Sequence, residues 1–310
     1  MKKISIVIPT FNEETNVRPI AQAVINEFLE NLCHYEYELI FIDNNSRDKT
    51  KSIIEEMCKN NINIKAIFNA RNFGPCNSPY YGLLQSSGDC TILLCADFQD
   101  PIYMIKQFID EWENGFKIVI GIKTSSEENW LMYKIRSIYY KLVQRFSDID
   151  QIEHFTGFGL YDKSFIHVLQ ELGDPMPFLR GIVAELGCKR KDIPYKQAKR
   201  RSGYSHLNFY SLYDCAMLSI TSYTKFGLRL AVFAGAIIAF CSMLIGFFYL
   251  ILKLLYWNKF AAGTAPILIG MMFLGAVQIF FIGFIGEYIL SINQRIMKRP
   301  LVIEEKRINF

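Results

Sequence analysis

Near its amino terminus the chain reads Ile4-Ser-Ile-Val-Ile-Pro-Thr-Phe-Asn-Glu-Glu14, an apolar run followed by a polar loop. The apolar run is short, rich in β-branched residues and ended by a proline, which is the pattern of a buried β-strand. A helical pattern begins near Asn16, directly after the loop. The stretch therefore predicts one unit of strand, loop and helix.

The same pattern recurs three times in the next part of the chain. Apolar runs at residues 38–43, 64–68 and 91–95 are each followed by a polar loop, and helical patterns lie between them. Strands that alternate with helices and are apolar throughout are typical of a parallel sheet with helices on both faces. The predicted fold class is therefore α/β, and ligands are expected at the carboxyl ends of the strands.

Acidic and amide side chains gather in the loops after three of these predicted strands. They are Asn12, Glu13, Glu14, Asp43, Asp48, Asp97, Gln99 and Asp100. A single loop carboxylate is more often a turn former or a helix cap than a ligand, but three such loops at one sheet edge can together bind a nucleotide. Asp97 and Gln99, two residues apart in a segment expected to be extended, can offer two oxygens to Mg²⁺ or Mn²⁺. The chain has neither a G-x-G-x-x-G nor a Walker A motif, which disfavours dinucleotide-binding and P-loop folds.

The composition excludes several classes of protein. Of the 310 residues, 51% are hydrophobic and 21% are charged, and the mean hydropathy is +0.15, which excludes a disordered chain or a small disulfide scaffold. The formal net charge is only +4 and forms no basic stripe, so nucleic-acid binding is not predicted. The eight cysteines form no C-x-x-C pair and are expected to be reduced thiols that face the cytosol.

Two long apolar stretches lie near the carboxyl terminus. Residues 230–252 and 260–286 contain no charged residue, and each exceeds the roughly 20 helical residues that cross a bilayer. Two buried helices of a soluble domain are the less favoured alternative. Lysines and arginines flank the outer ends of this pair more densely than the short connection, so both ends are predicted to face the cytoplasm.

Six motifs, taken in order, resemble those of a known family. They are Ile6-Val-Ile-Pro-Thr-Phe-Asn-Glu-Glu14, Ile42-Asp-Asn-Asn-Ser-Arg-Asp-Lys-Thr50, Arg71-Asn-Phe-Gly74, Asp97-Phe-Gln-Asp-Pro101, Thr156-Gly-Phe-Gly-Leu-Tyr161 and Ile285-Gly-Glu-Tyr288. They resemble the family 2 glycosyltransferases of the polyprenyl-phosphate hexose synthase branch, which includes enzymes like dolichol-phosphate mannose synthase and the bactoprenol glucosyltransferases. Each motif is weak alone, but six in the same order over nearly the whole chain are a specific signal.

The resemblance implies a GT-A fold, in which a Rossmann-like domain binds a nucleotide sugar and a hairpin of two transmembrane helices follows. It implies an inverting enzyme on the cytoplasmic face of the bacterial plasma membrane that moves a hexose to polyprenyl (undecaprenyl) phosphate with Mg²⁺ or Mn²⁺. Glucose is the favoured sugar and UDP the favoured nucleotide, ahead of N-acetylhexosamine, mannose or a modified pentose. The expected partners are the nucleotide sugar, the lipid and the membrane, with a homo-oligomer left open.

The resemblance also implies roles for residues of this chain. Pro9, Asn12, Glu13 and Asp43 would line the pocket for the nucleobase and ribose, and Asp97 and Gln99 would hold the cation on the diphosphate. Asp97 is expected to be catalytic, together with Arg71 and Arg200 near the phosphates. Independently of the resemblance, basic side chains in later segments are candidates for binding the acceptor phosphate: Arg136, Arg180 and Arg201.

These patterns predict that the chain is divided into three segments. Residues 1–226 are expected to form the cytoplasmic domain, residues 227–292 the two transmembrane helices (about 229–252 and 262–287), and residues 293–310 a basic cytoplasmic tail. The segment 130–146 has apolar residues at helical spacing with basic residues beside them, which fits a helix in the membrane interface and a core-facing helix equally well. Residues 207–226 predict a second surface helix that leads into the first span.

Several positions depart from the family's motifs. Cys95 replaces the first acid of the D-A-D-L-Q-D-P motif and does not suit Mg²⁺; the other departures are Asn44, Gly157, Gly159 and His206. Gly157 stands where the bactoprenol branch has an aspartate proposed as base, so no general base can be carried over. A lipid phosphate is already anionic near pH 7 and needs positioning more than deprotonation.

Two other hypotheses remain beside the enzyme. A catalytically silent membrane scaffold with the same fold is motivated by Cys95, Gly157 and Gly159. A processive polysaccharide synthase is disfavoured, because the chain has no Q-x-x-R-W motif and two spans are too few for a secretion channel.

Overall fold

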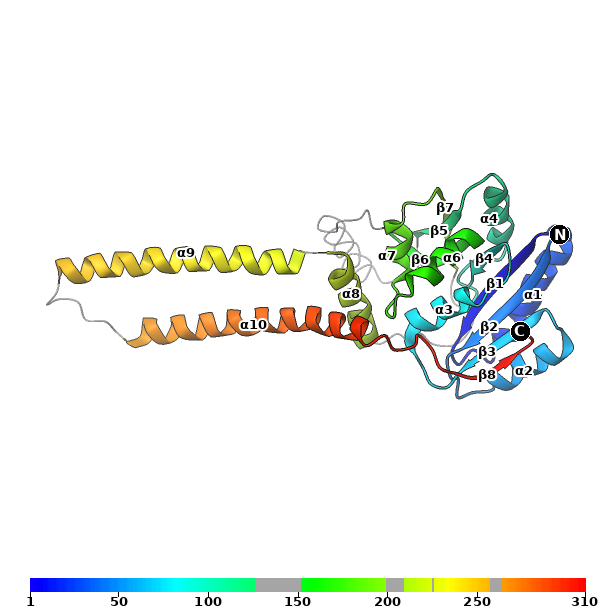
Figure 1. The fold of residues 1–310 in the computed structure, drawn as a ribbon, viewed down its shortest axis with the longest axis horizontal. Helices are drawn as coiled ribbons and strands as arrows, with labels where there is room; N and C mark the ends of the chain where they lie inside the picture. The colour runs from blue at the N-terminus through cyan, green and yellow to red at the C-terminus, as the bar shows by residue number, and fades with distance from the viewer. Residues whose placement is uncertain (126–151, 199–208, 225, 257–263) are drawn as a thin grey trace.

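The computed structural model describes residues 1–310 except for 126–151, 199–208, 225 and 257–263. The described strands are β1 Lys3–Thr10, β2 Glu36–Asp43, β3 Ile64–Asn69, β4 Cys90–Leu93, β5 Ile118–Ser125, β6 Phe155–Asp162, β7 Arg190–Lys196 and β8 Glu304–Ile308. The described helices are α1 Val17–Asn31, α2 Thr50–Asn60, α3 Gly74–Leu84, α4 Met104–Glu113, α6 Lys163–Leu172, α7 Leu179–Glu185, α8 Phe209–Tyr223, α9 Phe226–Leu255 and α10 Thr264–Ile296. These strands form one sheet in the order β7-β5-β6-β4-β1-β2-β3-β8 (Figure 1).

The centre of the sheet is parallel, as the alternating sequence pattern predicts. β1 pairs in parallel with β2 and with β4, and β2 pairs in parallel with β3, because each connecting helix returns the chain to the same end of the sheet. β6 and β8 run antiparallel to their neighbours. The α/β class is thus confirmed, and the sheet becomes mixed toward both edges.

Helices cover both faces of the sheet because its central strands are apolar on both sides. Ile4, Ile6 and Ile8 of β1 pack with α1, α2 and α4, whereas Val7 packs on the opposite face with α3, α6 and α7. On α3, a Cβ added to Gly82 would lie only 2.7 Å from Val7 Cγ1. This glycine lets α3 rest directly on β1, which brings the first turn of α3 to the carboxyl ends of the strands.

The carboxyl-terminal segment differs from the expected basic tail. α10 continues to Ile296, and β8 pairs antiparallel with β3 at the edge of the sheet (Figure 1). Lys51 Nζ lies 2.9 Å from Glu305 Oε2, and Tyr81 Oη donates to Glu304 Oε1 at 2.8 Å. Residues 304–308 therefore belong to the sheet, and charges of this strand pair with the α/β part at the sheet edge.

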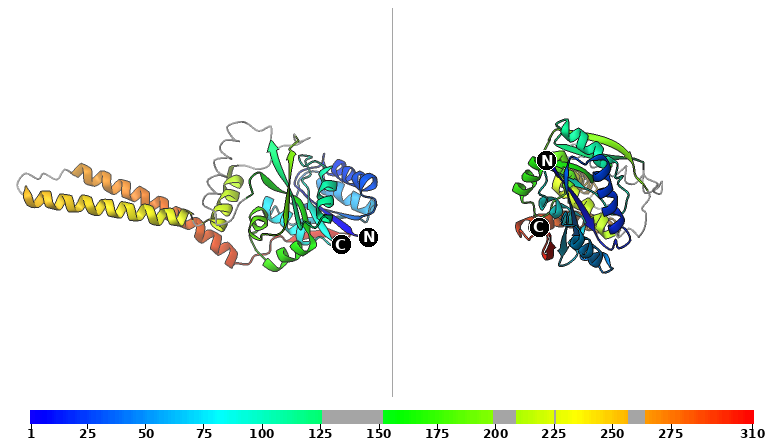
Figure 2. Two further views of the ribbon diagram at one scale, coloured as in Figure 1. Left: turned by 90° about the horizontal axis from the view of Figure 1, so that it is seen from above. Right: turned by 90° about the vertical axis from the view of Figure 1, so that its right-hand side faces the viewer.

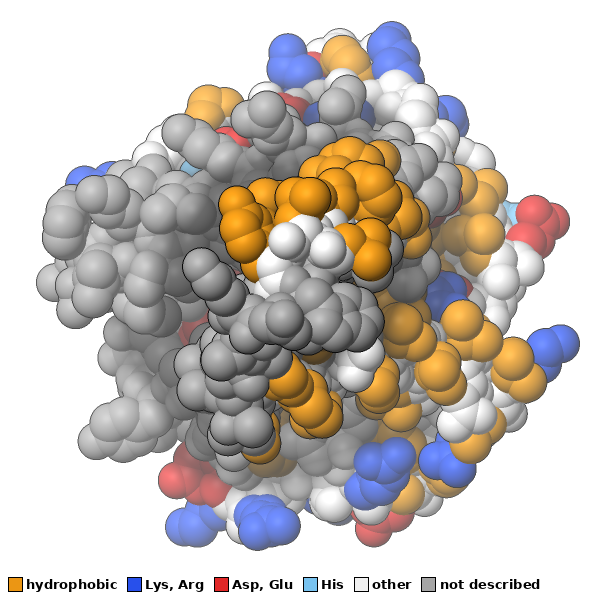
Figure 3. All heavy atoms as spheres, turned by 90° about the vertical axis from the view of Figure 1, so that its left-hand side faces the viewer, with side chains coloured by type: hydrophobic (Ala, Val, Ile, Leu, Met, Phe, Trp, Pro, Cys, Tyr) orange, Lys and Arg blue, Asp and Glu red, His pale blue; other side chains and the backbone are white. Residues whose placement is uncertain are grey.

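α9 and α10 form a hairpin that extends away from the α/β part, with α8 at its base (Figures 1 and 2). Both are long and apolar enough to cross a membrane: Ala231–Phe248 and Gly270–Ile296 have mean hydropathies of 2.4 and 1.8, and neither window is buried within the protein. Viewed from the hairpin end, apolar side chains lie in the middle and lysines and arginines lie at the rim (Figure 3). The predicted spans are thus helical, although α9 extends beyond both of its expected ends and α10 beyond its expected carboxyl end. The predicted helix 130–146 lies outside the described residues.

Candidate functional site

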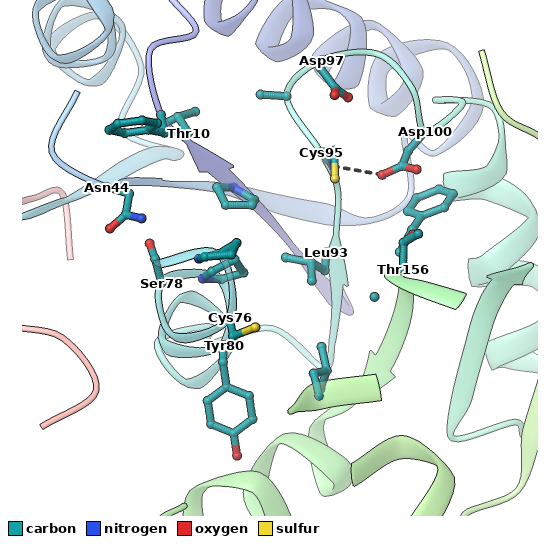
Figure 4. A pocket seen from close by; sticks show the side chains of 18 of the residues that line it. Thr10, Asn44, Cys76, Ser78, Tyr80, Leu93, Cys95, Asp97, Asp100 and Thr156 are labelled. Atoms are coloured by element: carbon teal, nitrogen blue, oxygen red, sulfur yellow. Dashed lines mark hydrogen bonds between the residues drawn. The ribbon is translucent and has the colours of Figure 1, made fainter. Parts of the chain in front are cut away.

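A pocket of about 540 Å³ opens at the carboxyl ends of the central strands (Figure 4). Its walls come from the loops after β1, β2, β3, β4 and β7, the carboxyl end of β5, the first two turns of α3, the first turn of α7 and the start of β6. Its polar and charged lining residues are Thr10, Glu13, Asn44, Asn72, Cys76, Ser78, Tyr80, Cys95, Asp97, Gln99, Asp100, Lys123, Thr156, Arg180 and Gln197. The pocket thus lies where parallel sheets bind their ligands.

Asp97 and Gln99 both line the pocket, from the loop after β4. This loop is a turn and not the extended segment expected from the sequence, because Phe98 adopts a left-handed conformation with a φ of 61°. The backbone N–H of Gln99 donates to Asp97 Oδ1 at 3.1 Å within this turn. A bulky residue at positive φ is strained, and such strain is found where surrounding contacts hold a functional loop. The turn places both predicted metal ligands on one wall.

Asp100 holds the same loop in place through buried hydrogen bonds. It is only 2% exposed, its Oδ1 accepts from Tyr195 Oη at 3.0 Å, and its Oδ2 accepts from the Cys95 backbone N–H at 3.2 Å. Desolvation raises the pKa of Asp100, and the hydrogen bonds from Cys95 and Tyr195 oppose that rise. Asp100 therefore ties the β4 loop to β7, and Asp97 is the carboxylate of this loop that is partly exposed in the pocket.

Cys95 lies beside these two carboxylates (Figure 4). Its surface is accessible from the pocket, yet the surrounding protein desolvates the thiol and raises the pKa of Cys95 well above its ordinary value. The charges of Asp100 and Asp97 raise it further. The group is therefore a neutral thiol at neutral pH, which is a poor ligand for Mg²⁺ or Mn²⁺.

Asn12 and Asp43 connect the loops around the pocket and do not line it. Asn12 has a φ of 55°, and its Oδ1 accepts from the Arg47 N–H at 2.8 Å. Asp43 is fully buried, and its carboxylate accepts from the Ser46 N–H at 2.9 Å and from Thr10 Oγ1 at 3.3 Å. Desolvation raises the pKa of Asp43, against these hydrogen bonds. Both residues thus hold the loops at the edge of the pocket through contacts with other loop residues.

Pro9 and Glu13, the other two predicted nucleotide residues, do line the pocket. Both flank the end of β1, and Glu13 is mostly buried, with its Oε2 accepting from Asn16 Nδ2 at 2.6 Å. The backbone N–H of Glu13 donates to Thr50 Oγ1 at 2.9 Å. These bonds hold the β1 loop against the first turns of α1 and α2.

Asn44 stands where the related motif has a second acid, and its contacts explain why an amide suits this position. Its Oδ1 accepts from Asn69 Nδ2 at 3.1 Å and from the Phe73 N–H at 2.9 Å, while its Nδ2 donates to Asn72 Oδ1 at 2.9 Å. A carboxylate could accept but could not donate to Asn72. The amide therefore joins the β2 loop to the loop before α3, and both loops line the pocket.

Of the predicted arginines, Arg180 lines the pocket and Arg71 does not. Arg180 lies in the first turn of α7, with its guanidinium carbon 5.2 Å from the centre of the Phe178 ring. Arg71 is exposed, and its guanidinium carbon lies 4.1 Å from the centre of the Phe73 ring. Arg136, Arg200 and Arg201 lie outside the described residues, so their roles stay predictions.

Lys123 is a pocket cation that sequence analysis missed. It lies near the carboxyl end of β5 and lines the pocket, and its charge opposes the rise in the pKa of Cys95. The rule that ligands gather at strand carboxyl ends applies to β5 as well and could have found it. Thr156 and Gly157 line the pocket from the start of the antiparallel strand β6, where that rule gives no guidance.

The oxygens of Asp97 and Gln99 fit a cation that binds together with a ligand. Among the residues that the structure describes, no group of three or more His, Cys, Asp or Glu side chains could hold a metal ion by itself. Mg²⁺ is commonly bound by one or two carboxylates, with substrate phosphates and water filling the other positions. One carboxylate and one amide therefore suit a cation that a diphosphate completes.

Comparisons with known proteins agree with this geometry. The model of the family described as glycosyl transferase family 2 matches residues 5–173. A bactoprenol glucosyl transferase derived from an SfII prophage of Shigella flexneri is 33% identical over 305 residues, which cover 98% of each chain. A prophage bactoprenol glucosyl transferase homolog of Escherichia coli (strain K12) is 31% identical over 97% of this chain and 98% of its own.

Two solved structures illustrate the similarity of this chain to known folds. One is glucosyl-3-phosphoglycerate synthase from Mycobacterium tuberculosis in complex with Mn²⁺, UDP-glucose and phosphoglyceric acid, with 15% identity, a TM-score of 0.49, and coverage of 71% of this chain and 78% of that chain. The other is S. aureus TarS 1–349, with 15% identity, a TM-score of 0.43, and coverage of 71% and 66%. Because both TM-scores lie below 0.5, the family assignment rests on the sequence matches.

Proposed function

Because this chain belongs to glycosyl transferase family 2, we propose that it transfers glucose from UDP-glucose to a polyprenyl phosphate at the surface of the bacterial plasma membrane. The observation that carries the proposal is the pocket at the strand ends, with Asp97 and Gln99 on one wall and Arg180 on another. The relatives named bactoprenol glucosyl transferase match the chain nearly from end to end, hairpin included, which supports a lipid acceptor of the same kind.

We assign the wall formed by the β1 and β4 loops to the nucleotide sugar. Pro9 and Glu13 would contact the base and ribose, while Asn12 and Asp43 would act through the loops that they hold. Asp97 and Gln99 would hold Mg²⁺ or Mn²⁺, which when bound neutralises charge on the diphosphate and so helps it leave.

Positive side chains would bind the remaining phosphate charge. Lys123 brings a cation to the pocket beside Cys95, and Arg71 and Arg200 are further candidates for the donor phosphates. Arg180 would bind the acceptor phosphate from the first turn of α7, where a guanidinium can offer two parallel donors. Arg136 and Arg201 are proposed for the same phosphate.

The proposed reaction is one direct displacement at the anomeric carbon. An oxygen of the lipid phosphate forms the new bond to the sugar, the bond to the nucleoside diphosphate breaks, and the configuration inverts. Because the second pKa of a phosphate monoester is about 6, this nucleophile needs no general base at pH 7. A reaction without a general base is consistent with Gly157 in the pocket wall, since glycine has no side chain that could accept a proton. The protein must supply position and electrostatic stabilisation of the leaving group.

We further propose that α9 and α10 cross the membrane with both outer ends in the cytoplasm. The basic residues beyond those ends follow the positive-inside rule. Tyr223 of α8 packs against Phe178 of the pocket wall, with ring centres 6.0 Å apart, so the pocket and the base of the hairpin are neighbours. A lipid headgroup could then reach the pocket while its tail stays in the bilayer.

Asp97→Asn tests the assignment of the donor site. The full-length protein in detergent is incubated with undecaprenyl phosphate and radiolabelled UDP-glucose, and labelled lipid is counted. We expect a loss of about a hundredfold or more in turnover, because the variant weakens electrostatic stabilisation of the leaving group. Asp110→Asn, at an exposed position of α4, is the matched control and should keep full activity. Near-normal turnover in Asp97→Asn would contradict the metal assignment.

Two measurements separate the alternatives. Calorimetry with UDP-glucose and Mn²⁺ should show metal-dependent binding, whereas a silent scaffold with the same fold would show none. A panel of labelled donors, including UDP-N-acetylglucosamine and GDP-mannose, should give labelled lipid best with UDP-glucose. If another donor gives more labelled lipid, the assignment of glucose as the transferred sugar is wrong. If no donor gives labelled lipid, the proposed reaction is wrong.

A further inference from the structure

Polar contacts join the end of α10 to α8 and to Thr224 directly after it, and the chemistry above does not use them. We call them the α8–α10 seam: Tyr213 Oη donates to Glu287 Oε1 at 3.1 Å, Tyr288 Oη donates to the Thr224 carbonyl at 3.0 Å, and Arg295 Nη2 donates to Ser222 Oγ at 3.0 Å. Tyr288 and Arg295 are seven residues apart, so they lie on one face of α10. The seam lies beyond the uncharged stretch 260–286 and so joins the polar end of this helix to α8.

Arg295 also contacts the loop before α7. Its Nη1 lies 3.2 Å from both carboxylate oxygens of Asp174, whose side chain is only 16% exposed. Asp174 Oδ1 in addition accepts from the Met176 N–H at 2.9 Å, which closes the turn that leads into α7. One carboxylate thus shapes this turn and binds the arginine of α10.

α8 supports α7 at a second point. The ring of Tyr223 lies against Phe178, and a Cβ on Gly181 would collide with that tyrosine ring. Only glycine allows α7 and α8 to approach this closely. Phe178, Leu179 and Arg180 at the start of α7 line the pocket. A continuous series of contacts therefore runs from α10 through α8 and Asp174 to the pocket wall that carries Arg180.

We propose that Arg295 and Asp174 are positioning residues for the acceptor, because their ion pair sets the pocket wall that carries Arg180 relative to α10. The inference rests on the proposed transfer to a lipid phosphate. The phosphate of such an acceptor lies at a depth that the bilayer sets, and α10 is the part of the chain that would be fixed in the same bilayer. A pocket wall held to α10 therefore stays at a constant distance from the depth at which the bilayer places the phosphate. Asp97 and Gln99 belong to the β4 loop, which is not part of the α8–α10 seam, so the ion pair should not affect donor binding.

Asp174→Asn and Arg295→Gln test this in the full-length protein, reconstituted in phosphatidylethanolamine and phosphatidylglycerol vesicles with undecaprenyl phosphate. The asparagine keeps an oxygen for the Met176 N–H and removes only the charge. A misplacement of the reacting groups by about 1 Å can lower the reaction rate about a hundredfold. Because the loss of one ion pair should shift the wall by less than that, we expect each variant to lower kcat/KM for undecaprenyl phosphate by about tenfold. Affinity for UDP-glucose, measured by calorimetry, should not change. Arg295→Lys keeps the charge and should retain most of the activity.

A short acceptor separates positioning from chemistry. Geranyl phosphate is soluble and can enter the pocket from water, so both variants should use it as well as the unmodified protein does. An equal loss with both acceptors would overturn the inference, since the pair would then serve folding or chemistry, and so would full activity with undecaprenyl phosphate. The control is Arg18→Gln, which breaks the 2.7 Å ion pair between Arg18 of α1 and Glu56 of α2. This variant should keep the kcat/KM of the unmodified protein with both acceptors.

The inference and the proposed function fail in different ways. If the unmodified protein binds UDP-glucose but glycosylates neither acceptor, the proposed reaction is wrong and the positioning role fails with it. If the unmodified protein glycosylates both acceptors and the two variants behave like it, only the positioning role is wrong.

Discussion

A buried ion cluster at the amino ends of β1 and β2 allows a quantitative test of what stabilises the fold. Glu38 is 1% exposed, and its Oε2 lies 2.8 Å from the Nζ atoms of both Lys3 and Lys65. Ser5 Oγ donates to the other oxygen at 2.6 Å. Desolvation alone would raise the pKa of Glu38, but these bonds lower it from 4.5 to about 2. Glu38→Gln removes the charge and keeps the shape.

The size and the pH dependence of the effect follow from this shift. A pKa that is lowered from 4.5 to about 2 corresponds to about 3 kcal/mol in the free energy of unfolding. Because the folded-state pKa lies below the unfolded one, this stability is present above the unfolded pKa and is lost as the pH falls toward 2. We therefore expect Glu38→Gln to lower the free energy of unfolding by about 3 kcal/mol at pH 7, and by progressively less below pH 4.5.

The measurement is urea unfolding of the full-length protein in detergent at several pH values. Tryptophan fluorescence reports the transition, since Trp112 is mostly buried and donates to Asp162 at 2.8 Å. Arg18→Gln is the control at an exposed ion pair and should change the free energy of unfolding by less than about 1 kcal/mol. A difference between Glu38→Gln and the unmodified protein that stays constant from pH 7 to pH 3 would refute the reasoning, because the charge would then not be its source.

Three further changes test the pocket and the sheet edge. Cys95→Asp adds a carboxylate beside Asp97, so a metal titration of activity should reach its midpoint at about tenfold lower Mn²⁺; an unchanged midpoint would show that position 95 does not reach the cation. Gly157 has a φ of 105°, so Gly157→Ala should lower the free energy of unfolding by about 1–3 kcal/mol in the urea experiment, and a neutral result would mean that the strand relaxes. Deletion of residues 303–310 removes β8 and exposes the edge of β3, so light scattering should reveal aggregation, and a monodisperse truncated protein would contradict this.

Local patterns in the chain were enough to predict the α/β class, the helical hairpin and the general place of the site. An apolar run reflects the burial of its own few residues, so each strand and each span can be recognised locally. The strand-end rule then placed Glu13, Asp97 and Gln99 at one site, and the family resemblance added Pro9; the structure has all four in the lining of the pocket. The strand-end rule failed for Asn12, Glu14, Asp43 and Asp48, because a loop residue can face its own backbone as easily as a ligand.

Tertiary contacts settled which charges pair and which face the pocket. Asp97 and Asp100 look alike in the sequence, yet Tyr195, far along the chain, donates to the buried Asp100, while Asp97 is partly exposed in the pocket. The charges of residues 304–307 look like a solvated tail until β8 aligns with β3 and brings them to Tyr81 and Lys51. Arg295 and Asp174 are 121 positions apart and meet only because α8 packs on α7. Burial and periodicity are properties of neighbouring residues, whereas a partner for a charge depends on how distant segments pack, and no local pattern carries that information.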